Sequence, residues 1–519
     1  MLRATRLGGG YNCDMTLVQG TPDQQSKAVS ENVFMQILPD SLALIAPADG
    51  VAYVRGATDV PLSESTIGDF LRDTAERFPE RQAVVFREQG VRWTWKEFDE
   101  RVDRFSAGLK SLGIAKGDRV GSWSPNRFEW LLTQFATARI GAVLVNINPA
   151  YRVSELEYAL RKVRCKALVT AEQFKTSKYI SMLLDIAPEL TSQQAGDLHC
   201  ARLPELRTVI SVGDPAIRGV MPFSAVMEKG EAILRDVEQT TIVLSAHDPI
   251  NIQFTSGTTG RPKGATLTHR NIVNNGRFVA MAMKLSEADS LCIPVPLYHC
   301  FGMVLAVLAC VSVGAKMVFP GEGFDARTTL ASIAEEGCTA LHGVPAMFEE
   351  LLTLPRPANW SCPNLRTGIV AGAPVPKPLM ERMLAELNMR EFTSSYGLTE
   401  ASPTCFNART DDTITTRLTT VGKLLPHLHA KIIDREGKTV KVGERGELCI
   451  SGYSLCKGYW KNKRKTDEAM VRDERGVLWL KTGDEAVFNE EGYCTITGRF
   501  KDIIIRGEWH CLPGMEKWK

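Results

Sequence analysis

The chain has 519 residues, too many for one compact core, so we expect two or more domains or subdomains. Its net charge of +2 gives no electrostatic reason to expect a nucleic acid or an anionic membrane surface as a partner. The thirteen cysteines include no C-x-x-C pair, which favours a reduced, intracellular compartment and argues against a clustered metal site. The longest apolar run, residues 303–313, is too short to span a bilayer.

Residues 1–65 are interpreted as an N-terminal extension that includes a possible targeting segment. Arg3 and Arg6 stand in a stretch with no acidic residue before Asp14, a composition that matches part of a mitochondrial presequence. A frayed terminus has the same composition. This segment alone therefore leaves a mitochondrial and a cytoplasmic location open.

From about residue 66 the sequence alternates between strand-like and helical segments. Residues 86–98 predict a hairpin that leads into a helix ending near residue 112. Strands are then expected at 120–124, 142–147 and 167–171, with helices between them through Trp130 and near Leu156. Apolar runs separated by amphipathic stretches indicate βαβ units and a parallel sheet. Residues 174–247 are poorly patterned and predict loops with an inserted element.

The alternation resumes after residue 264. Strands are expected at 291–295, 316–319, 339–344, 367–372 and 391–397, with helices beginning near residues 301, 326, 345 and 377. Beyond residue 413 the pattern changes to short β-rich stretches with glycine turns, as in 430–434, 446–452 and 493–498. The sequence therefore predicts an α/β body over residues 66–412 and a smaller β-rich subdomain over 413–497.

Residues 254–264, FTSGTTGRPKG, form the most informative segment. Glycines, hydroxyl side chains and Lys263 offer backbone N–H groups, donors and positive charge for a polyphosphate. It is not the common P-loop, because Lys263 is followed by Gly264 where that loop has a serine or threonine. The structural alternative is a surface turn; against it, an apolar strand precedes the loop and Thr268 is well placed to cap a helix. The candidate phosphate-binding residues are Thr255, Ser256, Gly257, Thr258, Thr259, Gly260, Arg261, Pro262 and Lys263.

Three later segments add candidate residues at predicted strand ends. His299 stands at a strand-to-helix junction, although a lone histidine is as often structural. The small residues of 371–376 would let a flat ring approach the backbone. In 394–400 a tyrosine could stack on a base, a threonine could bond a phosphate, and a carboxylate could hold Mg²⁺. The candidates in the last two segments are Gly372, Ala373, Pro374, Tyr396, Thr399 and Glu400.

Two charged residues follow in the β-rich part. The carboxylate of Asp484 could accept both hydroxyls of a ribose, and Arg499 could pair with phosphate or ribose. Each has an ordinary alternative as a surface charge or turn residue.

In order and residue type, these motifs together resemble the adenylate-forming superfamily, which comprises acyl-coenzyme A synthetases, luciferases and nonribosomal peptide adenylation domains. The resemblance is continuous from about residue 66 to residue 507. Residues 147–160, 251–275 and 296–303 look most like the mitochondrial medium-chain fatty acyl-CoA ligases. The resemblance implies an α/β fold with parallel sheets flanked by helices, plus a small β subdomain.

The resemblance implies a two-step reaction that uses ATP, Mg²⁺ and coenzyme A with a small carboxylic acid. The acid attacks the α-phosphate of ATP to give an acyl-adenylate and pyrophosphate, and the thiol of coenzyme A then displaces AMP. Cationic donors and Mg²⁺ would neutralise the phosphates as two anions approach. The resemblance implies that residues 255–263 hold the β- and γ-phosphates, that Thr399 meets the α-phosphate and that Glu400 binds Mg²⁺. It implies that 372–374 and Tyr396 flank adenine, while Asp484 takes the ribose hydroxyls and Arg499 contacts ribose and phosphate. His299 would line the acyl-carboxylate site.

Two observations refine this expectation. Residues 296–303 contain no acid to pair with an ammonium group, which argues against an amino acid substrate. After Gly507 the sequence departs from the family pattern, so residues 498–519 are expected to comprise a hinge motif and a divergent tail without the family's lid domain. Ligation is then expected to be impaired, because lid closure completes the site. The alternatives are an inactive nucleotide-binding form, a ligase for an aryl or other acid, and a luciferase-like oxidation.

Overall fold

The structure is a computed structural model that describes Pro47 and residues 50–236, 243–255, 261–357 and 359–500, with the side chains of 235 and 236 excepted. It also gives the backbone of two short strands, β25 (Ile504–Arg506) and β26 (Trp509–Cys511), which pair with each other. The predicted targeting segment, and the hinge and tail beyond Phe500 apart from these two strands, lie outside the described residues.

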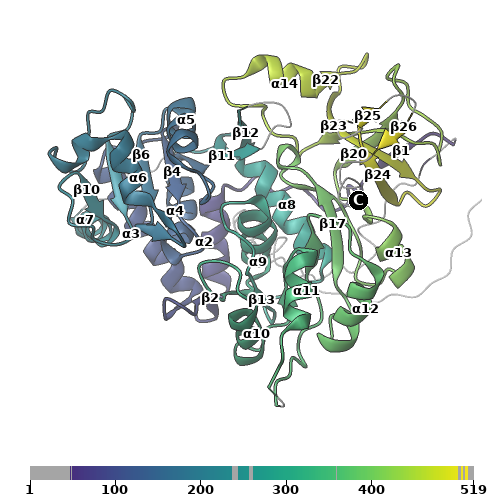
Figure 1. The fold of residues 1–519 in the computed structure, drawn as a ribbon, viewed down its shortest axis with the longest axis horizontal. Coiled ribbons are helices and arrows are strands. Elements are labelled where there is room, and N and C mark those ends of the chain that lie inside the picture. The colour runs from purple at the N-terminus through teal and green to yellow at the C-terminus, as the bar shows by residue number, and fades with distance from the viewer. Residues whose placement is uncertain are drawn as a thin grey trace, which may run out of the picture. The chain divides into compact units, whose positions relative to one another are not determined.

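A seven-stranded sheet forms the first part of the predicted α/β body, and Figure 1 shows helices α5, α6 and α7 beside it. Its strand order is β10-β9-β6-β4-β5-β11-β12, and all neighbours are parallel except β11 and β12. The strands are β4 (Arg119–Trp123), β5 (Val143–Asn146), β6 (Ala167–Thr170), β9 (Thr208–Ser211), β10 (Val220–Pro222), β11 (Pro249–Thr255) and β12 (Lys263–Thr268), with helices α3 (Trp95–Ser111), α4 (Phe128–Arg139), α5 (Val153–Val163), α6 (Tyr179–Ile186), η2 (Pro188–Thr191) and α7 (Phe223–Asp236) and the hairpin β7 (Gln173–Phe174) and β8 (Ser177–Lys178).

The interpretation of residues 174–247 as loops with an inserted element is wrong. This stretch supplies β9 and β10, which extend the parallel sheet beyond β6. All four residues of β9 are buried, so the strand is specified by its neighbours and shows no alternating pattern. The aromatic core beside it includes Trp123 stacked on Tyr179, with ring centroids 3.9 Å apart.

A five-stranded sheet forms the second part of the body, in the order β15-β13-β14-β2-β3. The hairpin of β2 and β3 runs into α3, as the sequence predicts for residues 86–98. The elements are α2 (Ile67–Arg77), β2 (Gln82–Phe86), β3 (Val91–Thr94), α8 (His269–Ala282), β13 (Ser290–Cys292), the π-helix η3 (Phe301–Leu308), α9 (Ala309–Val313), β14 (Lys316–Phe319), α10 (Ala326–Glu335), β15 (Ala340–Leu341) and α11 (Pro345–Thr353).

Two larger sheets remain, of four and six strands; Figure 1 shows the six-stranded one, apart from its first strand, in yellow and yellow-green near α14. A four-stranded sheet contains β16 (Ile369–Ala371), β17 (Thr393–Gly397), β18 (Thr404–Asn407) and β19 (Lys423–Leu424), with α12 (Lys377–Glu386), η4 (Thr399–Ala401) and α13 (Ile414–Thr419) nearby in sequence. An antiparallel six-stranded sheet contains β1 (Tyr53–Arg55), β20 (Leu428–Ile433), β21 (Gly446–Gly452), β22 (Met470–Arg472), β23 (Leu478–Phe488) and β24 (Cys494–Arg499), with α14 (Lys463–Ala469).

Strand β1 moves one predicted boundary. It pairs antiparallel with β20, so Tyr53 stands opposite Lys431 in the sheet of the β-rich subdomain. The predicted extension over residues 1–65 is therefore too long, because β1 (Tyr53–Arg55) belongs to the sheet of the β-rich subdomain. The pairing covers the outer edge of β20, which would otherwise expose a row of backbone donors and acceptors.

Helices α3 and α7 touch through two glycines. A Cβ atom added to Gly230 would lie 1.8 Å from the carbonyl oxygen of Arg104, and one added to Gly108 would lie 2.2 Å from that of Val226. Both contacts are with backbone atoms, which cannot rotate away as a side chain can. The helices therefore cross at a separation that only glycine allows at these positions.

His342 joins η3 to β16 in the interior. Its Nδ1 accepts the N–H of Ile369 at 3.1 Å, and its Nε2 lies 3.1 Å from the carbonyl oxygen of Leu305, so the ring is neutral with its proton on Nε2. Burial lowers the pKa of His342 from 6.5 to about 4. The unfolded chain thus binds more protons at this residue between these two values.

We therefore expect the stability contributed by His342 to be complete above pH 6.5 and to be lost as the pH falls toward 4. The loss is at most about 3 kcal/mol for this one group. In urea unfolding across this pH range, the free energy of unfolding should fall less steeply with pH for His342→Gln than for the wild type. The matched control is His199→Gln, which changes an exposed histidine outside the interior. Equal slopes for the wild type and His342→Gln would contradict the assignment.

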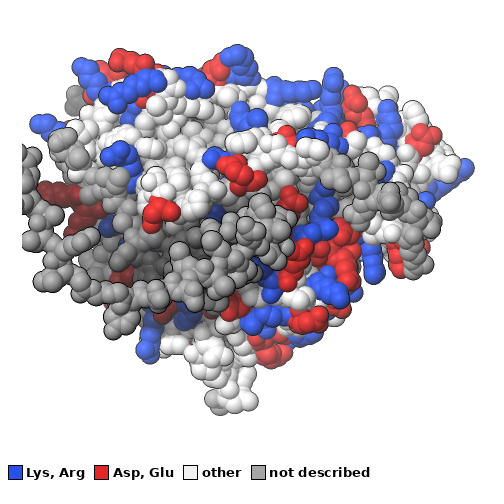
Figure 2. Space-filling view, turned by 180° about the vertical axis from the view of Figure 1, so that it is seen from behind, with Lys and Arg blue, Asp and Glu red and all other residues white. Residues whose placement is uncertain are grey.

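On the face shown in Figure 2, basic and acidic side chains are interspersed, in keeping with the net charge of +2. None of the helices in the described ranges is both long and apolar enough to cross a membrane.

Candidate functional site

A cleft of about 1070 Å³ opens where strand ends of the body meet the β-rich subdomain. β5 contributes Asn146 at its end, β11 contributes Thr255 and β17 contributes Gly397, while Asp484 of β23 and Arg499 of β24 face them. Ligands in α/β proteins bind at the carboxyl ends of parallel strands. Of the sequence-predicted residues, the cleft wall contains Thr255, Arg261, Pro262, Lys263, His299, Gly372, Thr399, Glu400, Asp484 and Arg499.

The two ends of the glycine-rich loop are held together by a β-hairpin. Thr255 pairs with Lys263 in the register of β11 and β12, and the Thr255 hydroxyl lies 3.4 Å from the Lys263 carbonyl oxygen. The expectation that the loop leads directly from a strand to a helix is incomplete, because β12 stands between them. Thr268 caps α8 as predicted, since its hydroxyl accepts the N–H of Asn271 at 3.2 Å. Ser256, Gly257, Thr258, Thr259 and Gly260 lie outside the described residues.

Lys263 and Glu400 approach each other through a third side chain, Tyr459. The Lys263 ammonium donates to the Tyr459 hydroxyl at 3.1 Å, and that hydroxyl donates to Glu400 Oε1 at 2.6 Å. Glu400 is buried, with 9% of its surface exposed, and the Thr255 hydroxyl lies 3.5 Å from the same oxygen. Burial and the nearby carboxylate raise the pKa of Tyr459, so its hydroxyl keeps its proton and remains a donor.

Asp484 forms the second charged centre. Its Oδ2 accepts the Tyr396 hydroxyl at 2.5 Å, and its Oδ1 accepts Nε–H of Arg499 at 2.8 Å. Asp484 is 5% exposed, and these two donors hold its carboxylate in one orientation. Tyr396 is therefore connected to the cleft through this hydrogen bond, and burial beside Asp484 raises its pKa.

His299 lies near the start of the π-helix η3 and opens onto the cleft. The N–H of Phe301 donates to its Nδ1 at 3.1 Å, which leaves Nε2 as the protonated nitrogen of the neutral ring. Solvent reaches the ring from the cleft, but protein atoms surround its other sides, and this desolvation lowers its pKa. The neutral imidazole is thus the form that faces the cleft at neutral pH.

The predicted adenine segment is only partly on the cleft wall. Gly372 follows β16, has a φ of +90°, and lines the cleft. Ala373 and Pro374 continue the same turn and are exposed, but they are not part of the cleft lining. The turn therefore reaches the cleft edge through its glycine.

Sequence reasoning missed several residues of the cleft lining, and two of them contact its charged residues or the turn beside them. Tyr459 is described above, and Glu447 accepts the N–H of Gly483 at 3.2 Å while its other oxygen lies 3.1 Å from the Lys481 ammonium. Glu447 thereby fixes the turn immediately before Asp484. Neither residue stands in a phosphate-binding motif, and only their aromatic or acidic character next to glycine turns could have drawn attention to them.

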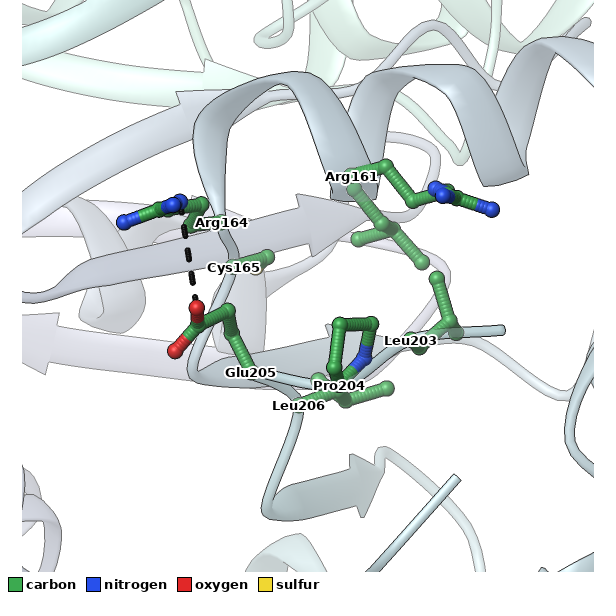
Figure 3. Close-up of a pocket in the computed structure, with 8 residues that line it drawn as sticks. Arg161, Arg164, Cys165, Leu203, Pro204, Glu205 and Leu206 are labelled. Atoms are coloured by element: carbon green, nitrogen blue, oxygen red, sulfur yellow. Dashed lines mark ion pairs between the residues drawn. The ribbon is translucent and has the colours of Figure 1, made fainter. Parts of the chain in front are cut away.

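A second, smaller pocket of about 210 Å³ lies between the end of α5 and the segment before β9 (Figure 3). It contains none of the sequence-predicted residues, and one ion pair, Arg164 with Glu205 at 3.8 Å, crosses it. Its lining comprises Leu160, Arg161, Arg164, Cys165, Leu203, Pro204, Glu205 and Leu206. The convergent polar groups are therefore concentrated in the large cleft.

Several known proteins are similar to this chain in sequence and in fold. The profile of the AMP-binding enzyme family matches residues 71–460. The acyl-CoA ligase SID4 of Ajellomyces capsulatus is 49% identical over 89% of this chain and 77% of that protein. The mitochondrial medium-chain acyl-CoA ligase ACSF2 of Homo sapiens is 42% identical over 90% of this chain and 76% of that protein.

The crystal structure of ATP-bound MatB from Rhodopseudomonas palustris superposes with a TM-score of 0.72 at 26% identity, covering 87% of this chain and 82% of that one. This likeness confirms the α/β fold that the sequence resemblance implied for the adenylate-forming body. Together with the family match over most of the chain, it makes the assignment secure. The chain belongs to the AMP-binding, adenylate-forming enzymes and, within them, to the acyl-CoA ligases, which are acid–thiol ligases.

Proposed function

We propose that this protein activates a medium-chain fatty acid with ATP at the large cleft and transfers the acyl group from the adenylate to coenzyme A. The observation that carries the proposal is the convergence of Lys263, Glu400 and the Asp484–Arg499 pair on one cleft. A cation and a hard carboxylate on one wall suit polyphosphate with Mg²⁺. A buried carboxylate with two fixed donors, on the other wall, suits a ribose diol.

The roles proposed for the individual residues follow from this division. Lys263, Thr255 and Arg261 supply positive charge and donors to the β- and γ-phosphates, while Thr399 faces the α-phosphate. Each oxygen of Asp484 already accepts one donor and retains a lone pair for a ribose hydroxyl. Gly372, Ala373, Pro374 and Tyr396 would flank adenine, and Arg499 would contact ribose and phosphate. His299, neutral and facing the cleft, would lie beside the acid's carboxylate without neutralising it.

Mg²⁺ suits the residues present at Glu400. Mg²⁺ is bound in nucleotide enzymes by one or two carboxylates together with substrate phosphates and water. Glu400 offers such a carboxylate, with a hydroxyl of Thr255 beside it, and the described residues hold no group of three or more metal-binding side chains that would form a closed protein cage. When bound, Mg²⁺ would neutralise phosphate charge, and Glu400 would hold the ion. Lys263 would neutralise phosphate charge as well.

The proposed acyl group rests on the human relative, which is named for medium-chain acids. A second candidate is a ligase for another carboxylic acid, because the more similar SID4 is named only as an acyl-CoA ligase. Both candidate functions use the nucleotide-binding residues discussed above, and they differ only in the pocket that holds the acyl group. A third, an inactive nucleotide-binding protein, predicts ATP binding without exchange of pyrophosphate.

The purified protein should be supplied with ATP, Mg²⁺ and coenzyme A and with acids ranging from butanoate to palmitate, together with benzoate. Pyrophosphate release and acyl-CoA formation are the two measurements. The proposal predicts the highest kcat/KM with octanoate, decanoate or dodecanoate. A preference for benzoate, or for none of the straight-chain acids, would contradict the medium-chain assignment. ATP binding without either product would favour the inactive form.

We further propose a mitochondrial location. It is supported by the human relative, named as mitochondrial, and by Arg3 and Arg6 in a stretch without acids. A fluorescent protein fused after residue 519 should co-localise with a mitochondrial marker. Cytoplasmic fluorescence from the full-length fusion would contradict the proposal.

A further inference from the structure

Tyr459 is held rigidly against the strand that carries Lys263. Its N–H donates to the Thr466 hydroxyl at 2.9 Å, and its backbone forms a β-bridge with Ala265 of β12. The next residue, Trp460, donates its N–H to the Gly264 carbonyl oxygen at 2.7 Å. Only 8% of Tyr459 is exposed. The position of its phenol is therefore set by the backbone on both sides.

The phenol hydroxyl lies between a cation and an anion. It accepts from Lys263 Nζ at 3.1 Å and donates to Glu400 Oε1 at 2.6 Å, while the same ammonium lies 4.2 Å from the centre of the ring. One hydroxyl thus uses its acceptor for the cation and its only proton for the carboxylate. The ring face adds a cation–π contact that holds the lysine beside the phenol.

We propose that Tyr459 is a positioning residue that keeps Lys263 and Glu400 apart, so that one remains available for the phosphates of ATP and the other for Mg²⁺. This inference rests on the nucleotide function proposed above. Opposite charges in a partly buried cleft attract strongly, and a direct ion pair would withdraw both groups from the substrate. The phenol hydrogen-bonds to both the ammonium and the carboxylate. Because the phenol is neutral, phosphate can replace it at Lys263 and Mg²⁺ can replace it at Glu400.

The conservative variant Tyr459→Phe keeps the ring and removes only the hydroxyl. Lys263 can then move onto Glu400, and the resulting pair competes with Mg²⁺ for the carboxylate. We expect the Mg²⁺ concentration needed for half-maximal ATP binding to rise about tenfold, the size of effect expected for a hydrogen bond to a charged group. The KM for MgATP should rise more than kcat falls, because the loss acts on the bound nucleotide.

The experiment is a calorimetric titration of ATP into the full chain, with Mg²⁺ and with EDTA, for the wild type, Tyr459→Phe, Glu400→Gln and the double variant. The expected result is that Tyr459→Phe reduces the gain in ATP affinity produced by Mg²⁺, and that this reduction disappears in the Glu400→Gln background. A matched control is Tyr493→Phe, which removes another phenol hydroxyl bonded to a carboxylate, that of Asp412 at 2.6 Å, away from the cleft lining.

Three outcomes separate the possibilities. A wild-type chain that fails to bind ATP overturns the proposed function and, with it, this inference. If the wild type binds ATP and Tyr459→Phe has the same Mg²⁺ dependence, the inference alone is overturned. It is also overturned if the affinity falls equally with Mg²⁺ and with EDTA, because that is the signature of a purely structural role.

Discussion

Replacing Glu400 with glutamine is expected to lower the rate of adenylate formation by about 10²- to 10³-fold, the usual effect of removing one group that stabilises transition-state charge. Glu400 is buried at the cleft wall, where Oε1 accepts from Tyr459, so under the proposed function its second oxygen is the one that would bind Mg²⁺. Glutamine has the same shape and can still accept the phenol proton, so the fold should be retained. Isotope exchange between pyrophosphate and ATP measures the first half-reaction without coenzyme A.

The matched control for this variant is Glu468→Gln. Glu468 lines the same cleft but is exposed on α14, where it pairs with Arg464 at 2.8 Å and with Lys465 at 2.5 Å. Exposed ion pairs contribute little to stability or to the geometry of a site, so the rate of pyrophosphate exchange should change less than about threefold. Equal activities of Glu400→Gln and the wild type, with unchanged thermal unfolding, would contradict the role of Glu400.

Replacing Gly230 with alanine is expected to lower the free energy of unfolding by about 3 kcal/mol, at the upper end of typical overpacking costs. The added methyl would stand 1.8 Å from the carbonyl oxygen of Arg104 and 2.8 Å from the backbone nitrogen of Gly108. Because both are helix backbone atoms, the whole of α7 must move away from α3 and lose packing along their contact. Urea unfolding followed by circular dichroism measures the effect.

Gly498→Ala is the control for this stability experiment. A Cβ at Gly498 would meet no atom within 4 Å, and its backbone is not in the left-handed region, so the midpoint should not fall. An unfolding midpoint of Gly230→Ala equal to that of the wild type would show that α3 and α7 can separate without cost.

Much of the fold could be predicted from the sequence because most strands of the body are short apolar runs separated by amphipathic helices. The prediction failed at β9 and β10, which have four and three residues and no alternation. A buried strand of that length is defined by the partner beside it, here β6, and not by its own residues. Strand β12 was missed for a related reason, since its pairing with β11 is needed to distinguish it from a loop.

The candidate residues that line the cleft were predicted where their chemistry is local. Lys263, Glu400 and Asp484 each stand in a motif with small or hydroxyl residues, and all three line the cleft. Tyr459 could not be found in this way, because its partners lie 196 and 59 residues away in the chain. Its position is set by the packing of the turn around Gly458 against β12. That placement depends on tertiary structure, whereas the motifs depend on neighbours in sequence.

Strand β1 also bears on how the protein is made. On the ribosome, Tyr53–Arg55 emerge long before their partners, since Tyr53 pairs with Lys431 and Val54 with Ala430. The sheet of the β-rich subdomain therefore cannot be completed until the whole of the body has been synthesised. Domains generally fold in the order of their synthesis, and long-range strand pairing is slow. The first strand must wait unpaired through most of translation, and nascent chains at that stage are where chaperones and aggregation would compete for it.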